Sequence, residues 1–202
     1  MAIDIFCADI GAVSRNNFGW FGHLATGQQI SGTDMAALSA AVRNSIESEN
    51  QVALGFEAPM FAPFRDTPSD LTKKRNGETN PNWIGGPGAT VMATALVQVP
   101  WILRAIRGSS PWQATMSWSE FKTMGIQLFL WEAFVSGAAK GASHVDDARI
   151  AVSKFQNSLP DPSSHNAINE PSVISLLGTA MLITGWCNSI SMLTEACVVI
   201  KA

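Results

Sequence analysis

Charged residues are scarce in this sequence: they make up 14% of its 202 residues, against roughly 25% in typical soluble domains. We therefore expect much of the chain to be buried, part of it in an interface of a homo-oligomer. The hydrophobic fraction of 47% is ample for the core of one domain that spans residues 1–202. The formal net charge is −3, which argues against a dedicated nucleic-acid binder but not against an enzyme that meets phosphate through a metal ion.

Cysteine is also scarce, and no Cys-x-x-Cys spacing occurs. Cys7, Cys187 and Cys197 all have apolar neighbours in the sequence, as is typical of buried thiols in a reducing cytosol. The N-terminus lacks the basic region and cleavage site of a signal peptide. The longest apolar stretches, 89–103 and 173–187, are too short and interrupted for membrane spans. We expect a cytoplasmic protein that does not contact a membrane.

The hydrophobic pattern predicts alternating strands and helices. Five strands are expected at 3–10, from about 16 to 25, and at 28–31, 51–57 and 126–135. Helices are expected from 34 to about 46, over 89–107 with a kink at Pro100, over 143–159 and over 170–186, and a short terminal strand at 197–200. Two hairpin-linked strands followed by alternating elements predict an α/β fold, a mixed five-stranded sheet flanked by helices.

Residues 58–88 interrupt this pattern. They are rich in proline, glycine and polar residues, and long loops in compact domains are usually either functional or disordered. We expect a long loop insertion, in which Arg75, Glu78 and Trp83 are candidates for a substrate loop. Glycine amides at the start of the helix that follows could bind an anion. A solvated, flexible excursion is the alternative interpretation.

Two acidic residues end strands in the same way. The run 3–9 ends in Asp9, and the run 52–57 ends in Glu57. Neighbouring strands can place such acids side by side at one edge of a sheet, and paired carboxylates there usually hold a divalent cation. Asp9 could instead serve the turn at Gly11, and Glu57 could simply be solvated. We favour the metal site because the pattern occurs twice.

A third group of candidates begins the helix expected over 143–159. His144 and Asp147 are three residues apart and share one helix face. The histidine could bind metal or accept a proton from a nucleophilic water. Asp146 and Asp147 also suit a helix start, where the helix dipole favours negative charge, so capping is an equal alternative for them.

These motifs resemble those of a known superfamily. Asp9-Ile10-Gly11, the strand-end Glu57 and the late helix start from His144 to Ala148 resemble RuvC-type Holliday-junction resolvases, which have the RNase H-like fold. The likeness is closer to a branch of predicted RNase H-fold nucleases. That branch has a Glu-Ala-Pro or Asp-Ala-Pro triplet after the fourth strand, here from Glu57 to Pro59, and a glutamate in the fifth strand, here Glu132.

The resemblance implies a metal-dependent phosphodiesterase, a nuclease that uses Mg²⁺ or Mn²⁺ to hydrolyse nucleic acid. It implies catalytic roles for Asp9, Glu57, His144 and Asp147, and metal binding by Asp9, Glu57, Asp147 and Asp146. A non-catalytic relative that keeps the fold for binding is the main alternative. Actin-like phosphotransferases share the Asp-x-Gly strand, but they clamp nucleotide between two such domains and this chain has room for only one.

Two acids leave questions open. The comparison branch takes its third acid from the last helix, where this chain has only Glu170 at the start. We expect Asp147 to take that place, because Glu170 precedes Pro171 and suits a helix cap. Glu132 lies inside an apolar strand. It is either functional or buried as the partner of an arginine, and the sequence favours neither.

Overall fold

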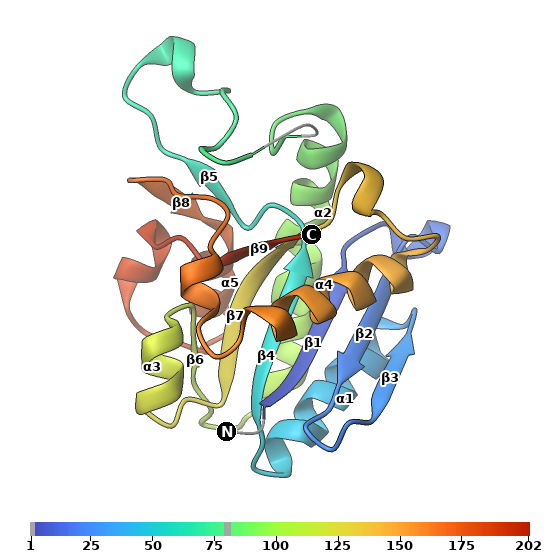
Figure 1. Cartoon of the computed structure of the whole chain (residues 1–202). Coiled ribbons are helices and arrows are strands. Elements are labelled where there is room, and N and C mark those ends of the chain that lie inside the picture. Colours follow the sequence, from blue (N-terminus) through green and yellow to red (C-terminus); the bar gives the residue numbers. More distant parts are fainter. Residues whose placement is uncertain (1–2, 79–81) are drawn as a thin grey trace.

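The computed structural model describes residues 3–78 and 82–202. Within them a seven-stranded mixed sheet has the order β3-β2-β1-β4-β7-β6, with β9 also paired to β7 (Figure 1). Its strands are β1 (Ile3–Asp9), β2 (Gly19–His23), β3 (Gln29–Gly32), β4 (Gln51–Glu57), β6 (Ala114–Thr115), β7 (Leu128–Phe134) and β9 (Val199–Lys201). The predicted α/β class is therefore confirmed, but the prediction of five strands was too low.

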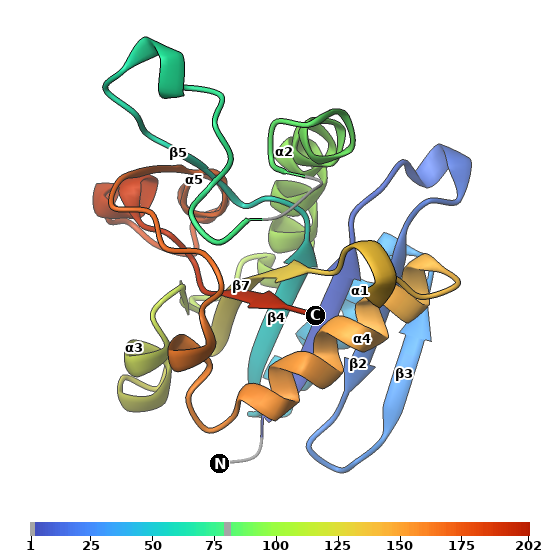
Figure 2. The same cartoon turned by 45° about the horizontal axis from the view of Figure 1, so that its top comes forward.

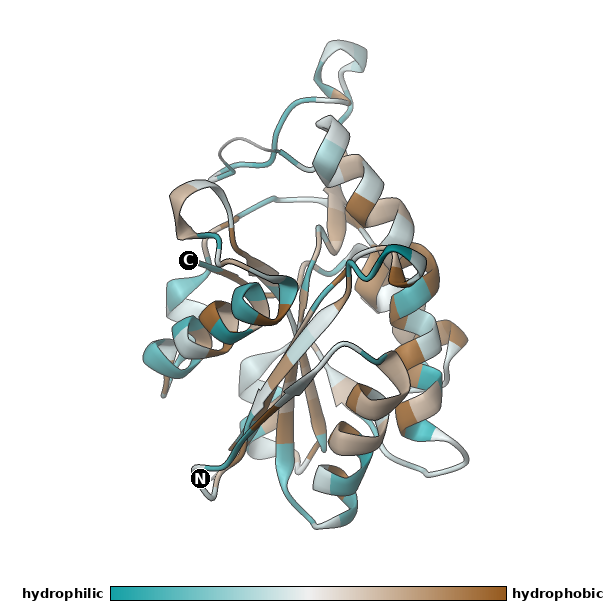
Figure 3. Ribbon diagram, turned by 90° about the vertical axis from the view of Figure 1, so that its right-hand side faces the viewer, coloured by the Kyte–Doolittle hydropathy of each residue, from teal (hydrophilic) through white to brown (hydrophobic). Residues whose placement is uncertain are grey.

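Five helices flank the sheet. They are α1 (Met35–Glu47), α2 (Gly86–Arg107), α3 (Trp118–Thr123), α4 (His144–Ser158) and α5 (Leu176–Ile183). Figure 3 views the sheet nearly edge-on, with α4 on one side and α1 and α2 on the other. Side chains from α5 join the core beneath α1 and α2, and side chains from α3 join the core beneath α4. The result is a sheet between two helical layers.

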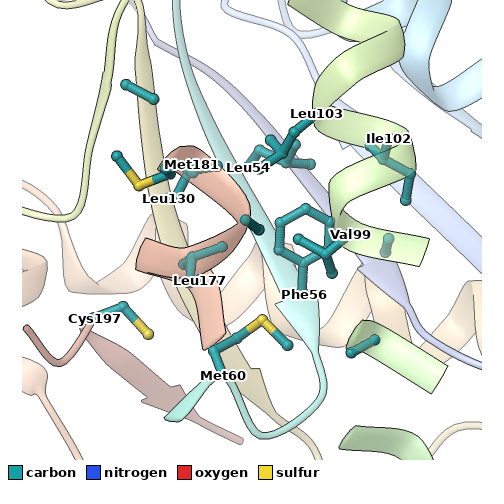
Figure 4. Close-up of a cluster of buried hydrophobic side chains, with 14 of the residues drawn as sticks. Leu54, Phe56, Met60, Val99, Ile102, Leu103, Leu130, Leu177, Met181 and Cys197 are labelled. Atoms are coloured by element: carbon teal, nitrogen blue, oxygen red, sulfur yellow. The ribbon is translucent and has the colours of Figure 1, made fainter. Parts of the chain in front are cut away.

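The central strands are buried on both faces, which explains why their sequences are continuous apolar runs. Phe6, Leu54 and Phe56 point toward α1, α2 and α5. Figure 4 shows Leu54 and Phe56 of β4 beside Val99, Ile102 and Leu103 of α2. The alternate side chains point toward α4, whose buried stripe includes Ala148, Ala151, Val152 and Phe155. Any polar group at the end of β1 or β4 is consequently held on a defined face.

The first turn of α4 approaches the start of β2 closely. A Cβ atom on Gly19 would lie 2.5 Å from the carbonyl carbon of His144 and from the amide nitrogen of Val145. Only glycine leaves room for this approach, because real Cβ atoms do not come so close to backbone. Ser143 caps the helix, since its hydroxyl accepts a hydrogen bond from the amide of Asp146. Together these features fix where the first turn of α4 lies over the sheet.

Several predicted boundaries were wrong. The helix expected over 170–186 begins only at Leu176, because Val173–Ser175 forms β8 and pairs with β5 (Phe61–Pro63) in a second, two-stranded sheet. β5 also interrupts the loop expected at 58–88, of which residues 79–81 lie outside the described residues. Between α2 and β7 the chain also forms β6 and α3, neither of which is among the elements predicted above. Figure 2 shows the excursion after β5 rising beyond the sheet.

The helix α2 starts three residues earlier than expected, at Gly86, and continues through Pro100. By length and composition it could cross a membrane, and it is the one helix of the described residues that could. Yet Val99, Ile102 and Ile106 are buried in the domain core, and the core helix of a soluble protein has the same composition. One side of α2 therefore packs into the core of the domain. Leu96, Val97 and Trp101 are exposed on the outer side of α2. The expected cytoplasmic location and the expected homo-oligomer remain predictions.

Candidate metal centre

Asp9 and Glu57 lie side by side at the carboxyl ends of β1 and β4. The two strands are parallel, and Asp9 is in register with Glu57. Residues paired this way point to the same face of a sheet, here the face covered by α4. The two carboxyl groups are close enough for each to affect the pKa of the other. The adjacency expected from the two strand ends is therefore confirmed.

The surroundings of this pair favour its neutral form. Burial raises the pKa of the Asp9 carboxyl to about 7. Burial, followed by repulsion from Asp9, also raises the pKa of Glu57 well above its ordinary value. Two acids so close and so buried cannot both ionise cheaply unless a positive charge joins them. A bound cation is one way to supply that charge.

Helix α4 brings two further ligand groups to the same place. The Nδ1 atom of His144 lies 2.6 Å from Oδ2 of Asp9, and Asp147, one turn further on, is buried. Three residues, Asp9, His144 and Asp147, each have a ligand atom that lies within 4.8 Å of the ligand atoms of the other two. The expected sharing of one helix face by His144 and Asp147 is confirmed.

This donor set fits a divalent metal ion. Carboxylate oxygens suit Mg²⁺ and Mn²⁺, and a neutral imidazole nitrogen is a common ligand for transition metals. Burial raises the pKa of both acids, so a bound cation would favour their ionised form. The group of Asp9, His144 and Asp147, in which both carboxylates are buried, can therefore hold a metal ion, with Glu57 adjoining it. The group alone does not specify which metal.

The predicted ligand Asp146 lies outside this group. Its carboxylate accepts hydrogen bonds from the hydroxyl of Ser143 and from the guanidinium of Arg149. These bonds lower the pKa of the exposed Asp146 carboxyl. The residue acts as part of the helix start, which was the alternative interpretation from sequence, and the metal role expected for it is not supported.

Glu170 is likewise held elsewhere. Its Oε1 atom accepts hydrogen bonds from Arg65, at 2.8 Å, and from the amide of Asn76, at 2.6 Å. It therefore ties the excursion after β5 to the segment before β8. Asp147, rather than Glu170, lies with Asp9, as the sequence argument expected.

Glu132 forms a buried ion pair on the opposite face of the sheet from Asp9. Its two carboxylate oxygens lie 2.7 and 2.8 Å from the guanidinium of Arg75, and Glu78 pairs with the same guanidinium. Glu132 also accepts a hydrogen bond from the amide of Met60. Glu132 therefore has an arginine partner, one of the two interpretations from sequence, and we call this group the Arg75 clasp.

The Arg75 clasp changes the interpretation of the expected substrate loop. Arg75 and Glu78 are both buried rather than solvated, although both line a pocket beside Glu57. Trp83 is also buried, and its indole N–H donates to the carbonyl of Lys73 at 2.9 Å. The mixture of charge and glycine suggested solvent exposure. Pairing with Glu132 of β7 instead buries Arg75, and Glu78 lies against the same guanidinium.

A pocket of about 100 Å³ lies between Glu57 and the Arg75 clasp, next to the metal-binding group of Asp9, His144 and Asp147 that Glu57 adjoins. Glu57 lines one side of it, Glu132 another, and Pro87 and Gly88 of the first turn of α2 contribute as well. Lys140 also lines this pocket, and its amine lies 3.2 Å from Oδ2 of Asp147. Sequence reasoning missed Lys140, because nothing in the surrounding run of small residues marks it.

Comparisons of the chain with protein-family models, with curated protein sequences and with solved structures found no match.

Proposed function

We propose that this protein is a divalent-metal-dependent phosphodiesterase of the RNase H-like type that hydrolyses nucleic acid with Mg²⁺ or Mn²⁺. One observation carries the proposal: Asp9, which is in register with Glu57, lies with His144 and Asp147 in a group whose ligand atoms are close enough to hold one metal ion. The element order supports it, because the strands that end in these acids, β1 and β4, are neighbours at the centre of the sheet.

Each residue has a distinct part in this proposal. Asp9, Glu57 and Asp147 would hold the metal ions. When bound, such ions stabilise the negative charge on the attacking and leaving oxygens of a phosphodiester. Glu57 also lines the pocket, so a phosphate bound there would lie next to the carboxylate pair.

His144 is placed to handle a proton. If its Nδ1–H donates to Oδ2 of Asp9, across the 2.6 Å contact, the other ring nitrogen, Nε2, is left as an acceptor. The side chain is 38% exposed, so water can reach it. A histidine oriented in this way by a carboxylate is suited to accept a proton from an attacking water.

A non-catalytic relative is the second candidate, and two observations favour it. The net charge of −3 offers no general attraction for nucleic acid. Both oxygens of Asp147 already have partners, the amide of Gly141 for Oδ1 and the amine of Lys140 for Oδ2. Such a protein would bind metal without cleaving a phosphodiester.

A cleavage assay with Mn²⁺ tests the proposal, using single-stranded, double-stranded and branched DNA together with RNA. The wild type should cleave at least one of these, and Asp147→Asn should lower the rate by roughly 100-fold or more. Glu170→Gln is the matched control and should keep activity, provided that it folds. Metal binding without any cleavage would favour the non-catalytic relative. Loss of cleavage in Glu170→Gln alone would show that the active-site helix is misplaced.

A further inference from the structure

Lys140 brings a positive charge into contact with the metal-binding group. It follows the short helix at Gly137–Ala139, and its amine pairs with Oδ2 of Asp147 at 3.2 Å. The amine also interacts electrostatically with Asp9 and Glu57. The single ammonium group of Lys140 thus attracts three carboxyl groups that lie close together.

The backbone around Lys140 is built to hold this position. The amide of Gly141 donates to Oδ1 of Asp147 at 2.6 Å, so consecutive residues engage both oxygens of one carboxylate. A Cβ atom on Gly141 would lie 2.4 Å from the Cβ of Asp146, so a larger residue would push this segment away from α4. The close approach of the segment to Asp147 therefore depends on glycine at this position.

The contact also leaves the ammonium able to move. The side chain of Lys140 is 47% exposed, and Lys140 lines the same pocket as Glu57. A lysine with four rotatable carbons can swing into this space without any change in the backbone. The pairing with Asp147 is therefore a contact that an incoming cation could break.

We propose that Lys140 is the resident cation of this carboxylate group and that a divalent metal ion must displace its ammonium from Asp147 in order to bind. The inference rests on the proposed metal site. It assigns Lys140 a competing role, in which the side chain stabilises the metal-free protein and weakens metal binding. In this inference the ammonium and the metal use the same oxygen, Oδ2 of Asp147, so that the two states exclude each other.

Isothermal titration of the whole chain with Mn²⁺ tests this inference, comparing the wild type with Lys140→Gln. The variant should bind Mn²⁺ roughly fivefold more tightly, because the competing pair is partly exposed and of moderate strength. It should also melt at a lower temperature than the wild type in chelator, and gain more from added Mn²⁺. Lys154→Gln is the matched control: Lys154 is exposed on α4 itself, and its loss should change neither quantity.

The outcomes separate the inference from the proposed function. Equal or weaker Mn²⁺ binding by Lys140→Gln, with clear binding by the wild type, would overturn the competing role of Lys140 alone. If neither protein bound Mn²⁺, the metal site itself would be overturned together with this inference. Binding by Lys140→Gln but not by the wild type would support strong competition.

Discussion

His144 Nδ1 lies 2.6 Å from Asp9 Oδ2, and this contact joins the first residue of α4 to the last residue of β1. Since Asp9 is in register with Glu57, one helix start meets the ends of two neighbouring strands. The chemistry that we propose depends on this contact between the start of α4 and the ends of β1 and β4.

The metal-free protein should become less stable as the pH rises from about 4 to about 7. Burial raises the pKa of Asp9 from 3.8 to about 7. Between these values the folded chain keeps a proton that the unfolded chain has lost, so the free energy of unfolding falls with rising pH. Below the pKa that Asp9 has in the unfolded chain, its raised pKa in the folded chain costs no stability. Above the pKa in the folded chain, it lowers the free energy of unfolding by its full amount, of order 4 kcal/mol.

Urea unfolding in chelator at about pH 4.5 and about pH 7.5 measures this dependence. Asp9→Asn removes the titrating group, so its stability should change less between the two pH values, and at the higher pH it should equal or exceed that of the wild type. Parallel pH profiles for the two proteins would contradict the assignment of the penalty to Asp9.

Gly19→Ala should disturb the site without touching any ligand. The new Cβ would lie 2.5 Å from the backbone of His144, so α4 must shift away from β2, at a cost of about 1–3 kcal/mol. Mn²⁺ binding should weaken as His144 and Asp147 move from Asp9. Gly86→Ala is the control, since a Cβ there meets nothing within 4 Å. Unchanged Mn²⁺ affinity in a folded Gly19→Ala protein would show that the site does not need this close approach.

The central part of the fold could be predicted from the sequence because its strands and helices have regular hydrophobic patterns. The apolar runs of β1 and β4 and the amphipathic pattern of α4 predicted their elements within about two residues, and thereby the position of the site. Strand ends in a parallel pair meet at one edge, so the adjacency of Asp9 and Glu57 followed from local pattern alone. The α3 helix also had a local signal that was missed, a serine at 117 followed by Glu120, which is the spacing of a capping box.

Other features depend on contacts between distant segments, which one sequence does not reveal. Each strand of the β5 and β8 pair is three residues long, too short for a period, and its conformation comes from pairing across more than a hundred residues. The ion pair of Arg75 with Glu132 spans 57 positions. The contact of Lys140 with Asp147 spans only seven positions, but it depends on the close approach of Gly141 to Asp146. Burial and charge pairing of this kind are decided by tertiary structure.

The Arg75 clasp should stabilise the fold rather than bind metal. Glu132→Ala leaves the buried guanidinium of Arg75 without one of its two carboxylates and removes the acceptor for the amide of Met60. We expect a loss of about 3–5 kcal/mol in the free energy of unfolding, the usual result of breaking a buried pair. Urea unfolding measures it, and the exposed pair of Asp70 with Lys73 supplies the control, because Asp70→Asn should leave stability unchanged.

Mn²⁺ affinity should separate the roles of the two carboxylate groups. Glu132 faces away from Asp9, so Glu132→Ala should bind Mn²⁺ like the wild type at a temperature where both are folded. A stability loss below about 1 kcal/mol would show that the clasp is not a major support of the fold. A large loss of Mn²⁺ affinity in the folded variant would place Glu132 in the metal site.

Calorimetric titration of Mn²⁺ into the wild type, Asp9→Asn and Asp146→Asn tests the central claim most directly. Both variants lose one carboxylate charge near the start of α4, but only Asp9 belongs to the metal-binding group. The wild type should bind, Asp146→Asn should bind with nearly the same affinity, and Asp9→Asn should bind roughly tenfold more weakly or worse. Equal affinity in all three proteins, or no binding by the wild type, would contradict a metal centre at the ends of β1 and β4.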